Sequence, residues 1–368
     1  MKPEEKLKKI IEEAEKYKPD PSTKEKIDFS LEQLKRSNEL FINLLLSKEK
    51  KVDYDENEFK SKIERIIQEN DKRLTNYLEL KRNNNVKIEI VDRRELLRGV
   101  LKEFEKNLEL MIYFQYSPEA VNEKQKRLSK IYKTSIFSAL KNMAKIIGAG
   151  MVTLAMYKYF AYNTLGKYDT LESNLNIKNE GVISIIAPNV IEKAEKIGIN
   201  LEDFMTRVAI HEEIHHRQLT NYPQIVEKRN ELSKNLLALG YVIIYDGFGG
   251  LNKEEAKYLY QKVSNEITSL MTCLEGHASF FEKKILKEVI KDYDGLIKKI
   301  EKYRKKRRTK RIKPLKVKMD QYIEGEKFVK AVYGEFGTKS SRLIFENLPT
   351  IEEIKNPNKY IEKLKPLI

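Results

Sequence analysis

The chain has 368 residues, of which 40% are hydrophobic and 9% aromatic, so it can build a core, is long enough for two domains and is not a disordered chain. Its single cysteine, Cys273, excludes an intramolecular disulfide framework and indicates a reducing compartment. The formal net charge of +15 leaves contact with nucleic acid open, but acidic and basic residues alternate throughout, so we interpret the charge mainly as a compositional bias.

Charged helical patterns fill the first quarter of the chain. Helices are predicted over Pro3–Lys18, Ser22–Leu46 and Glu56–Arg82, followed by a short strand at Lys87–Val91. No apolar segment follows the charged start of the sequence, so we expect no signal peptide and a cytoplasmic protein. We predict a helical N-terminal region over residues 1–92, and its heptad-like runs leave a role in binding a partner open.

The middle of the chain becomes more apolar. Long helices are predicted over Leu96–Tyr116 and Ala120–Tyr162. The most apolar run, Ile146–Tyr157, is about half as long as a membrane span requires, so we interpret it as a buried helix and expect no transmembrane segment. The clearest strand follows at Gly181–Pro188, and Tyr241–Tyr245 is either another strand or the end of a helix.

The run from His211 to His216 holds three of the four histidines. It contains the pattern H-E-x-x-H, which on a helix puts His211 and His215 on one face, one turn apart. Two imidazoles at this spacing can hold one zinc ion while Glu212 points toward a bound water. His216 points about 140° away from His211 and is expected to lie outside the ligands. This arrangement is typical of a zinc hydrolase.

A third ligand is expected from another element, because catalytic zinc takes three protein groups. A helix predicted over Val263–Val289 carries two candidates, Glu275 and His277. They point about 200° apart, so they are not expected to bind the same ion. We favour Glu275 as the ligand, with a solvated carboxylate as its alternative. We expect His277 to be a core histidine or to contact a ligand residue without contacting the metal. Cys273 is expected to be a small buried residue.

Six motifs in order along the chain resemble the zincin-like metallopeptidase type 2 family, whose members are often associated with deazaflavin coenzyme biosynthesis. The motifs are Leu165–Asp169, Ile185–Asn189, His211–Gln218, Leu274–Ala278, Lys318–Val329 and Asn347–Pro357. The resemblance implies that His211 and His215 are metal ligands, that Glu212 is the catalytic acid and base, and that Glu275 is the third ligand. It names no substrate.

We therefore predict an α+β, predominantly helical fold with a zincin-like domain over residues 93–368. Its active-site helix would carry H-E-x-x-H, with a short sheet beside it and the N-terminal helices as an appendage. By analogy with zincins, the exposed edge of the strand at 181–188 would hold an extended peptide, and a core strand is an equal alternative. The expected activity is that of a gluzincin-like metallopeptidase, which uses one zinc ion per chain and a proton transfer by Glu212.

Three points stay open. Tyr322 is a candidate for stabilising developing negative charge, although a core tyrosine is the commoner case. The basic run Lys302–Arg311 is expected to be an exposed loop first and an anion-binding patch second. The alternatives to a peptidase are a metal-stabilised scaffold that binds nucleic acid or protein without catalysis, and an amidase for a small substrate. A peptide or protein substrate is favoured over nucleic acid.

Overall fold

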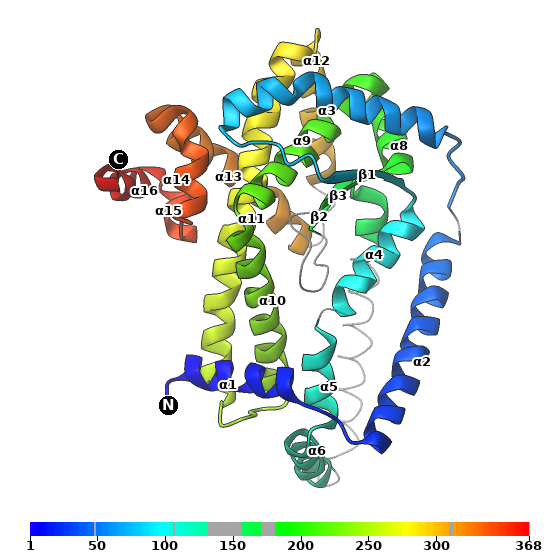
Figure 1. Ribbon diagram of the computed structural model, residues 1–368, viewed down its shortest axis with the longest axis vertical. Helices are drawn as coiled ribbons and strands as arrows, with labels where there is room; N and C mark the ends of the chain where they lie inside the picture. Colours follow the sequence, from blue (N-terminus) through cyan, green and yellow to red (C-terminus); the bar gives the residue numbers. More distant parts are fainter. Residues whose placement is uncertain (48, 106, 132–156, 171–180, 309–312, 368) are drawn as a thin grey trace. The chain divides into compact units, whose positions relative to one another are not determined.

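A computed structural model describes the chain except residues 48, 106, 132–156, 171–180, 309–312 and 368 (Figure 1). The described residues form helices and one three-stranded sheet, which confirms the predicted α+β, predominantly helical class. They divide into two compact units: unit 1 holds residues 1–50, 93–163 and 231–264, and unit 2 holds 51–92, 164–230 and 265–368. The chain leaves unit 2 after Asp92, where the sequence predicted a domain boundary; a domain division there stays a prediction.

Unit 1 is helical. Its described residues include helices α1 (Pro3–Lys16), α2 (Pro21–Leu46), α4 (Arg93–Glu105), α5 (Leu108–Tyr116) and α6 (Pro118–Ile131), with parts of α10 (Pro223–Ile244) and α11 (Lys253–Val289). Helix α1 buries Leu7, Ile10 and Ala14 at helical spacing and packs on α5. The helix predicted over Leu96–Tyr116 is two helices, and Tyr241–Tyr245 mostly continues α10 rather than forming a strand.

The sheet of unit 2 has the strand order β1-β3-β2, with β1 at Val86–Val91, β2 at Gly166–Thr170 and β3 at Gly181–Ile186. Strand β1 runs parallel to β3, and β2 runs antiparallel to it with Gly166 opposite Ile185. The predicted strands at 87–91 and 181–188 are therefore confirmed. Of the two alternatives for 181–188, an exposed edge and a core strand, the core strand is the one observed: β3 is central and almost entirely buried, because nearly all its side chains are apolar.

Helices surround this sheet. In unit 2, α3 (Glu56–Leu78) packs on β1, and α8 (Ala187–Ile197) and α9 (Leu201–Asn221) pack on β3. Helix α9 also packs on β2 and α3, which agrees with their neighbouring positions in Figure 1. The remaining helices are α12 (Tyr293–Arg308), α13 (Lys313–Phe336), α14 (Ser340–Glu346), α15 (Ile351–Lys355) and α16 (Pro357–Leu364), with the short 3₁₀ turns η1 (Gly337–Lys339) and η2 (Lys365–Leu367).

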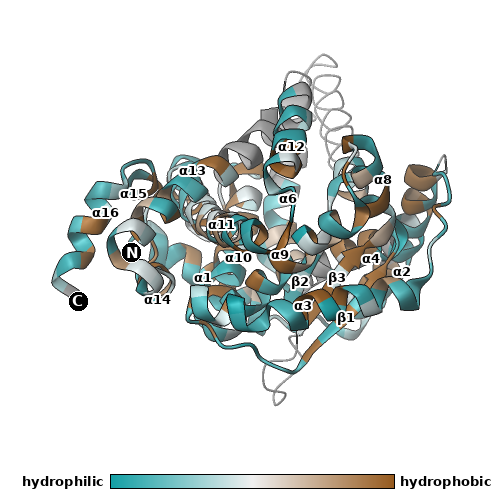
Figure 2. Ribbon diagram, turned by 90° about the horizontal axis from the view of Figure 1, so that it is seen from above, coloured by the Kyte–Doolittle hydropathy of each residue, from teal (hydrophilic) through white to brown (hydrophobic). Residues whose placement is uncertain are grey.

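Two further predictions concern charged and apolar runs. The basic run was expected to be a loop, but residues 302–308 belong to α12, which is largely hydrophilic in Figure 2; residues 309–311 lie outside the described part. This expectation was wrong because lysine and arginine favour helices, and no glycine or proline interrupts the run. The apolar run at 146–157 lies outside the described residues except Tyr157. In the described part of the chain, no helix combines the length and apolarity needed to cross a membrane.

Candidate metal centre

Helix α9 begins at a strong local signal. Gly198, at φ 73°, ends α8, and the side chain of Asn200 accepts hydrogen bonds from the backbone of Glu202 and Asp203 at 2.8 and 3.2 Å. These two acidic residues also suit the positive end of the helix. The helix then runs without interruption through the H-E-x-x-H pattern to Asn221, so the predicted active-site helix is present.

His211 and His215 face each other across one helical turn, with 3.2 Å between their Nε2 atoms. The Oε2 atom of Glu275, from α11, lies 3.4 Å from His211 Nε2 and 3.5 Å from His215 Nε2. Ligand atoms about 2.0–2.1 Å from a tetrahedral zinc ion are about 3.3–3.4 Å apart, so these three spacings fit a zinc ion. The structure therefore brings together the three residues predicted as ligands, and they form a group that could hold a metal ion.

The carboxylate of Glu275 gives a second indication of a cation. Its Oε2 atom is buried, and the two imidazole nitrogens lie 3.4 and 3.5 Å from it without an ordinary hydrogen-bond geometry. A buried carboxylate is costly unless a cation or well-placed hydrogen-bond donors compensate its charge. A metal ion between Glu275 and the two imidazoles would supply that compensation.

The outer nitrogens of both histidines are held in place. His211 Nδ1 donates to Glu282 Oε2 at 2.8 Å, and Glu282 Oε1 accepts from Arg207 Nε at 2.7 Å. His215 Nδ1 lies 2.8 Å from Gln218 Oε1. These contacts leave both Nε2 atoms directed toward Glu275. Sequence reasoning did not assign Glu282 or Gln218 to the site, although Glu282 lies seven residues after Glu275 on the same helix face.

Glu212 lies beside the group and is buried. Burial, together with the negative charges of Glu275 and Glu282, raises the pKa of Glu212 above its ordinary value, although the two histidines oppose this change. The first residue of β2, Gly166, packs directly on this side chain: a Cβ atom there would lie 2.5 Å from Glu212 Cγ. This contact gives a physical reason for the glycine in the motif Leu165–Asp169.

The other two histidines lie outside the group. His216 Nε2 donates to the carbonyl oxygen of Asn83 at 2.9 Å, and burial lowers the pKa of His216 to about 4. His277 is fully buried between Phe281 and Phe345, and burial lowers its pKa to about 3. Both side chains are therefore neutral at pH 7.

Tyr322 lies next to the histidines. The centre of its ring is 6.4 Å from that of His211, and its side chain is partly exposed on α13. This position is compatible with contact to a substrate. A role in stabilising negative charge stays a prediction.

A buried ion-pair network holds α9 from its opposite face. Arg217 Nε pairs with Glu213 Oε1 at 3.0 Å, and Arg217 Nη1 donates to the carbonyl oxygen of Leu80 at 3.0 Å. Arg217 also pairs with Asp71 of α3, and Arg82 lies 3.3 Å from Glu213 Oε1. Because Arg217 and Glu213 are fully buried, the network fixes the position of α9.

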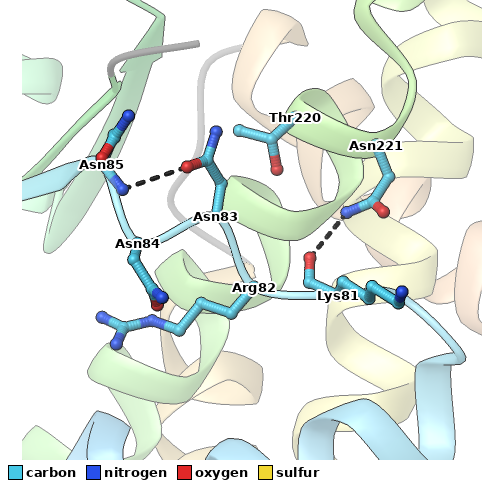
Figure 3. Close-up of a pocket in the computed structure, with 7 residues that line it drawn as sticks. All are labelled: Lys81, Arg82, Asn83, Asn84, Asn85, Thr220 and Asn221. Carbon is cyan, nitrogen blue, oxygen red and sulfur yellow. Dashed lines mark hydrogen bonds between the residues drawn. The ribbon is translucent and has the colours of Figure 1, made fainter.

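A surface pocket of about 410 Å³ lies near this network (Figure 3). It is lined by residues 81–85 together with Thr220 and Asn221, and Asn221 donates to the carbonyl oxygen of Lys81 at 2.8 Å. The lining is polar and includes none of the three candidate ligands. We therefore do not assign the predicted chemistry to this pocket.

Comparison with known proteins agrees with this geometry. The chain is similar to the crystal structure of a proposed hydrolase with a novel fold from Chloroflexus aurantiacus, with a TM-score of 0.61 and 21% sequence identity over 90% of this chain and 97% of that one. No curated protein has a significantly similar sequence. Residues 44–361 match the family model described as zincin-like metallopeptidase. The chain belongs to the zincin-like metallopeptidase family.

Proposed function

We propose that the protein is a zinc-dependent metallopeptidase with one zinc ion per chain. His211, His215 and Glu275 would hold the ion, and Glu212 would transfer the proton. The observation that carries this proposal is the close approach of the three ligand atoms, within 4.8 Å of one another, directly beside a buried glutamate. Membership of the zincin-like metallopeptidase family supports the same activity.

The residues divide the chemistry between them. When bound, zinc supplies a Lewis acid that polarises a carbonyl group and lowers the pKa of water toward neutrality. Glu212 takes a proton at its carboxylate from the attacking water and returns it to the leaving nitrogen. Burial raises the pKa of Glu212 above its ordinary value, which makes its carboxylate a stronger proton acceptor. Gly166 keeps the space that the carboxylate occupies.

Strand β2 is the element that we expect to hold an extended peptide. It is an edge strand of the described sheet, and it runs antiparallel to β3. A peptide that adds to a sheet edge gains backbone hydrogen bonds without needing a particular sequence. Because Gly166 at the start of β2 contacts Glu212, such a peptide would pass the catalytic carboxylate. This assignment replaces β3 as the expected substrate-binding strand.

The test uses zinc-loaded protein, a broad peptide library and a panel of small amides. Glu212→Gln should retain its zinc and lower the hydrolytic rate by about 10²–10⁴-fold. Glu202→Gln, an exposed position on the first turn of the same helix, should leave the rate unchanged. Cleavage of small amides alone would indicate the amidase alternative. Full zinc loading without any hydrolysis would instead favour a scaffold that binds a partner.

A further inference from the structure

A line of buried hydrogen bonds connects His215 to the interior of unit 2. His215 Nδ1 contacts Gln218 Oε1 at 2.8 Å, Gln218 Nε2 contacts His277 Nδ1 at 2.9 Å, and His277 Nε2 contacts Ser341 Oγ at 2.9 Å. Gln218, His277 and Ser341 are each fully buried. We propose that His277 is a positioning residue that fixes the proton of His215 through Gln218. The proposal rests on the zinc site proposed above.

The direction of these hydrogen bonds follows from one backbone carbonyl. Gln218 Nε2 lies 3.1 Å from the carbonyl oxygen of Leu274, which can only accept a hydrogen bond. The amide nitrogen of Gln218 must therefore face Leu274 and His277, and both of its protons are used there. Its oxygen, Oε1, is left facing His215.

The proton positions of both histidines then follow. Gln218 Oε1 can only accept, so His215 carries a proton on Nδ1, and in the neutral imidazole the lone pair of Nε2 then faces Glu275 and His211. His277 Nδ1 accepts from Gln218, so its own proton lies on Nε2 and is donated to Ser341. The line therefore prepares His215 Nε2 to bind a metal ion.

The two ligand histidines differ in how much support they need. His211 Nδ1 faces the carboxylate of Glu282. Both carboxylate oxygens can only accept a hydrogen bond, so His211 must carry a proton on Nδ1 whichever oxygen it faces. His215 is held by an amide, which could turn over and present its NH₂ group instead. If the amide turned over, its NH₂ group would face His215 Nδ1 and donate to it. The proton of His215 would then lie on Nε2, the atom that must bind the metal. Leu274 opposes this rotation because a turned Gln218 would direct its oxygen at a carbonyl oxygen, and His277 opposes it because its proton would have to move from Nε2 to Nδ1.

The same line joins the helices that carry the ligands. Gln218 lies on α9 with His215, and its amide binds Leu274, the residue before Glu275 on α11. A rotation of Gln218 would therefore disturb both the proton of one ligand and the helix of another. This arrangement explains why a histidine that is not in the ligand group lies two residues from Glu275.

Nuclear magnetic resonance of ¹⁵N-histidine protein tests the proposal, because the chain has only four histidines. Long-range ¹H–¹⁵N spectra of zinc-free wild type should give His215 the Nδ1–H form. His277→Phe keeps an aromatic ring between Phe281 and Phe345 but removes the acceptor. Only the carbonyl oxygen of Leu274 then holds the amide of Gln218, so we expect part of His215 to change to the Nε2–H form and the zinc affinity, measured by competition with a chelator, to fall about 10–100-fold.

Two variants separate positioning from packing. Phe281→Leu removes ring contact with His277 but no hydrogen bond of the line, so it should lower thermal stability while leaving the His215 proton and the zinc affinity unchanged. His277→Asn keeps an acceptor near the position of Nδ1 and should restore much of the affinity.

The proposal is overturned if His277→Phe keeps the wild-type proton position, or if Phe281→Leu lowers zinc affinity equally. If wild type binds no zinc, the proposed function fails, but the proton position in the zinc-free protein still decides the role of His277.

Discussion

Helices α11 and α13 cross at two glycines next to the candidate ligand Glu275, and an alanine at Gly276 tests whether this contact fixes the ligand. A Cβ atom on Gly276 would lie 2.2 Å from the carbonyl carbon of Gly325 and 2.4 Å from its Cα. Carbon atoms pack at about 3.5–4.0 Å, so α13 would have to retreat by about 1.3 Å or more. The obstacle is backbone, which cannot rotate away as a side chain would.

The expected cost can be compared with a matched control. Overpacking a close contact costs about 1–3 kcal/mol, whereas alanine in place of glycine inside a helix stabilises by about 1 kcal/mol. Gly334 lies on the same helix α13, and a Cβ atom there would meet nothing within 4 Å. Because both glycines lie in helices, the helical gain cancels, and Gly276→Ala should be about 1–3 kcal/mol less stable than Gly334→Ala.

The assays are urea unfolding for the free energy and competition with a chelator for zinc affinity. Gly276→Ala should also bind zinc at least about tenfold more weakly, because Glu275 is the adjacent residue and its oxygen must stay near the two imidazole nitrogens. Gly334→Ala should bind zinc as wild type does. Equal stability of the two variants would refute the glycine contact, and wild-type affinity in Gly276→Ala would refute its link to the ligand.

Three other substitutions test separate parts of the site. The added methyl group of Gly166→Ala should displace the Glu212 side chain, and a misplacement of about 1 Å can cost about 100-fold in rate. Kinetics should show that loss with the zinc content unchanged, and a wild-type rate would contradict the contact. Glu282→Gln should weaken zinc binding about tenfold in a chelator competition, because a ligand histidine loses its carboxylate acceptor, and unchanged affinity would remove Glu282 from the site. Arg217→Met should cost about 3 kcal/mol or more in urea unfolding, since it leaves Glu213 buried with less compensation, and a loss below about 1 kcal/mol would contradict the ion-pair network.

The local part of the site could be predicted from the sequence. His211 and His215 are four residues apart on a helix, so their approach follows from helix geometry alone. The choice of Glu275 over His277 depended on helix phase, which is also local, and the structure places Glu275 with the two histidines. The same reasoning could have pointed to Gln218, three residues after His215.

Other contacts depend on how distant elements pack, and no spacing within one helix predicts them. Gly166 meets Glu212, Gly276 meets Gly325, and His277 meets Ser341 only because separate elements come together. Analogy left the strand at 181–188 either at an exposed edge or in the core, and its continuous apolar run, typical of a strand covered on both faces, favoured the core position that is observed. The break between α4 and α5 carries no proline or glycine, so periodicity alone extended one helix across it.

The most direct test of the account is a crystal structure of zinc-loaded protein with diffraction data collected on both sides of the zinc absorption edge. The account predicts one anomalous peak per chain, with His211 Nε2, His215 Nε2 and a Glu275 oxygen each about 2.0–2.2 Å from it. It also predicts that Glu212 lies beside the ion without binding it. No peak at this position, or a peak bound by His277 in place of Glu275, would contradict the account.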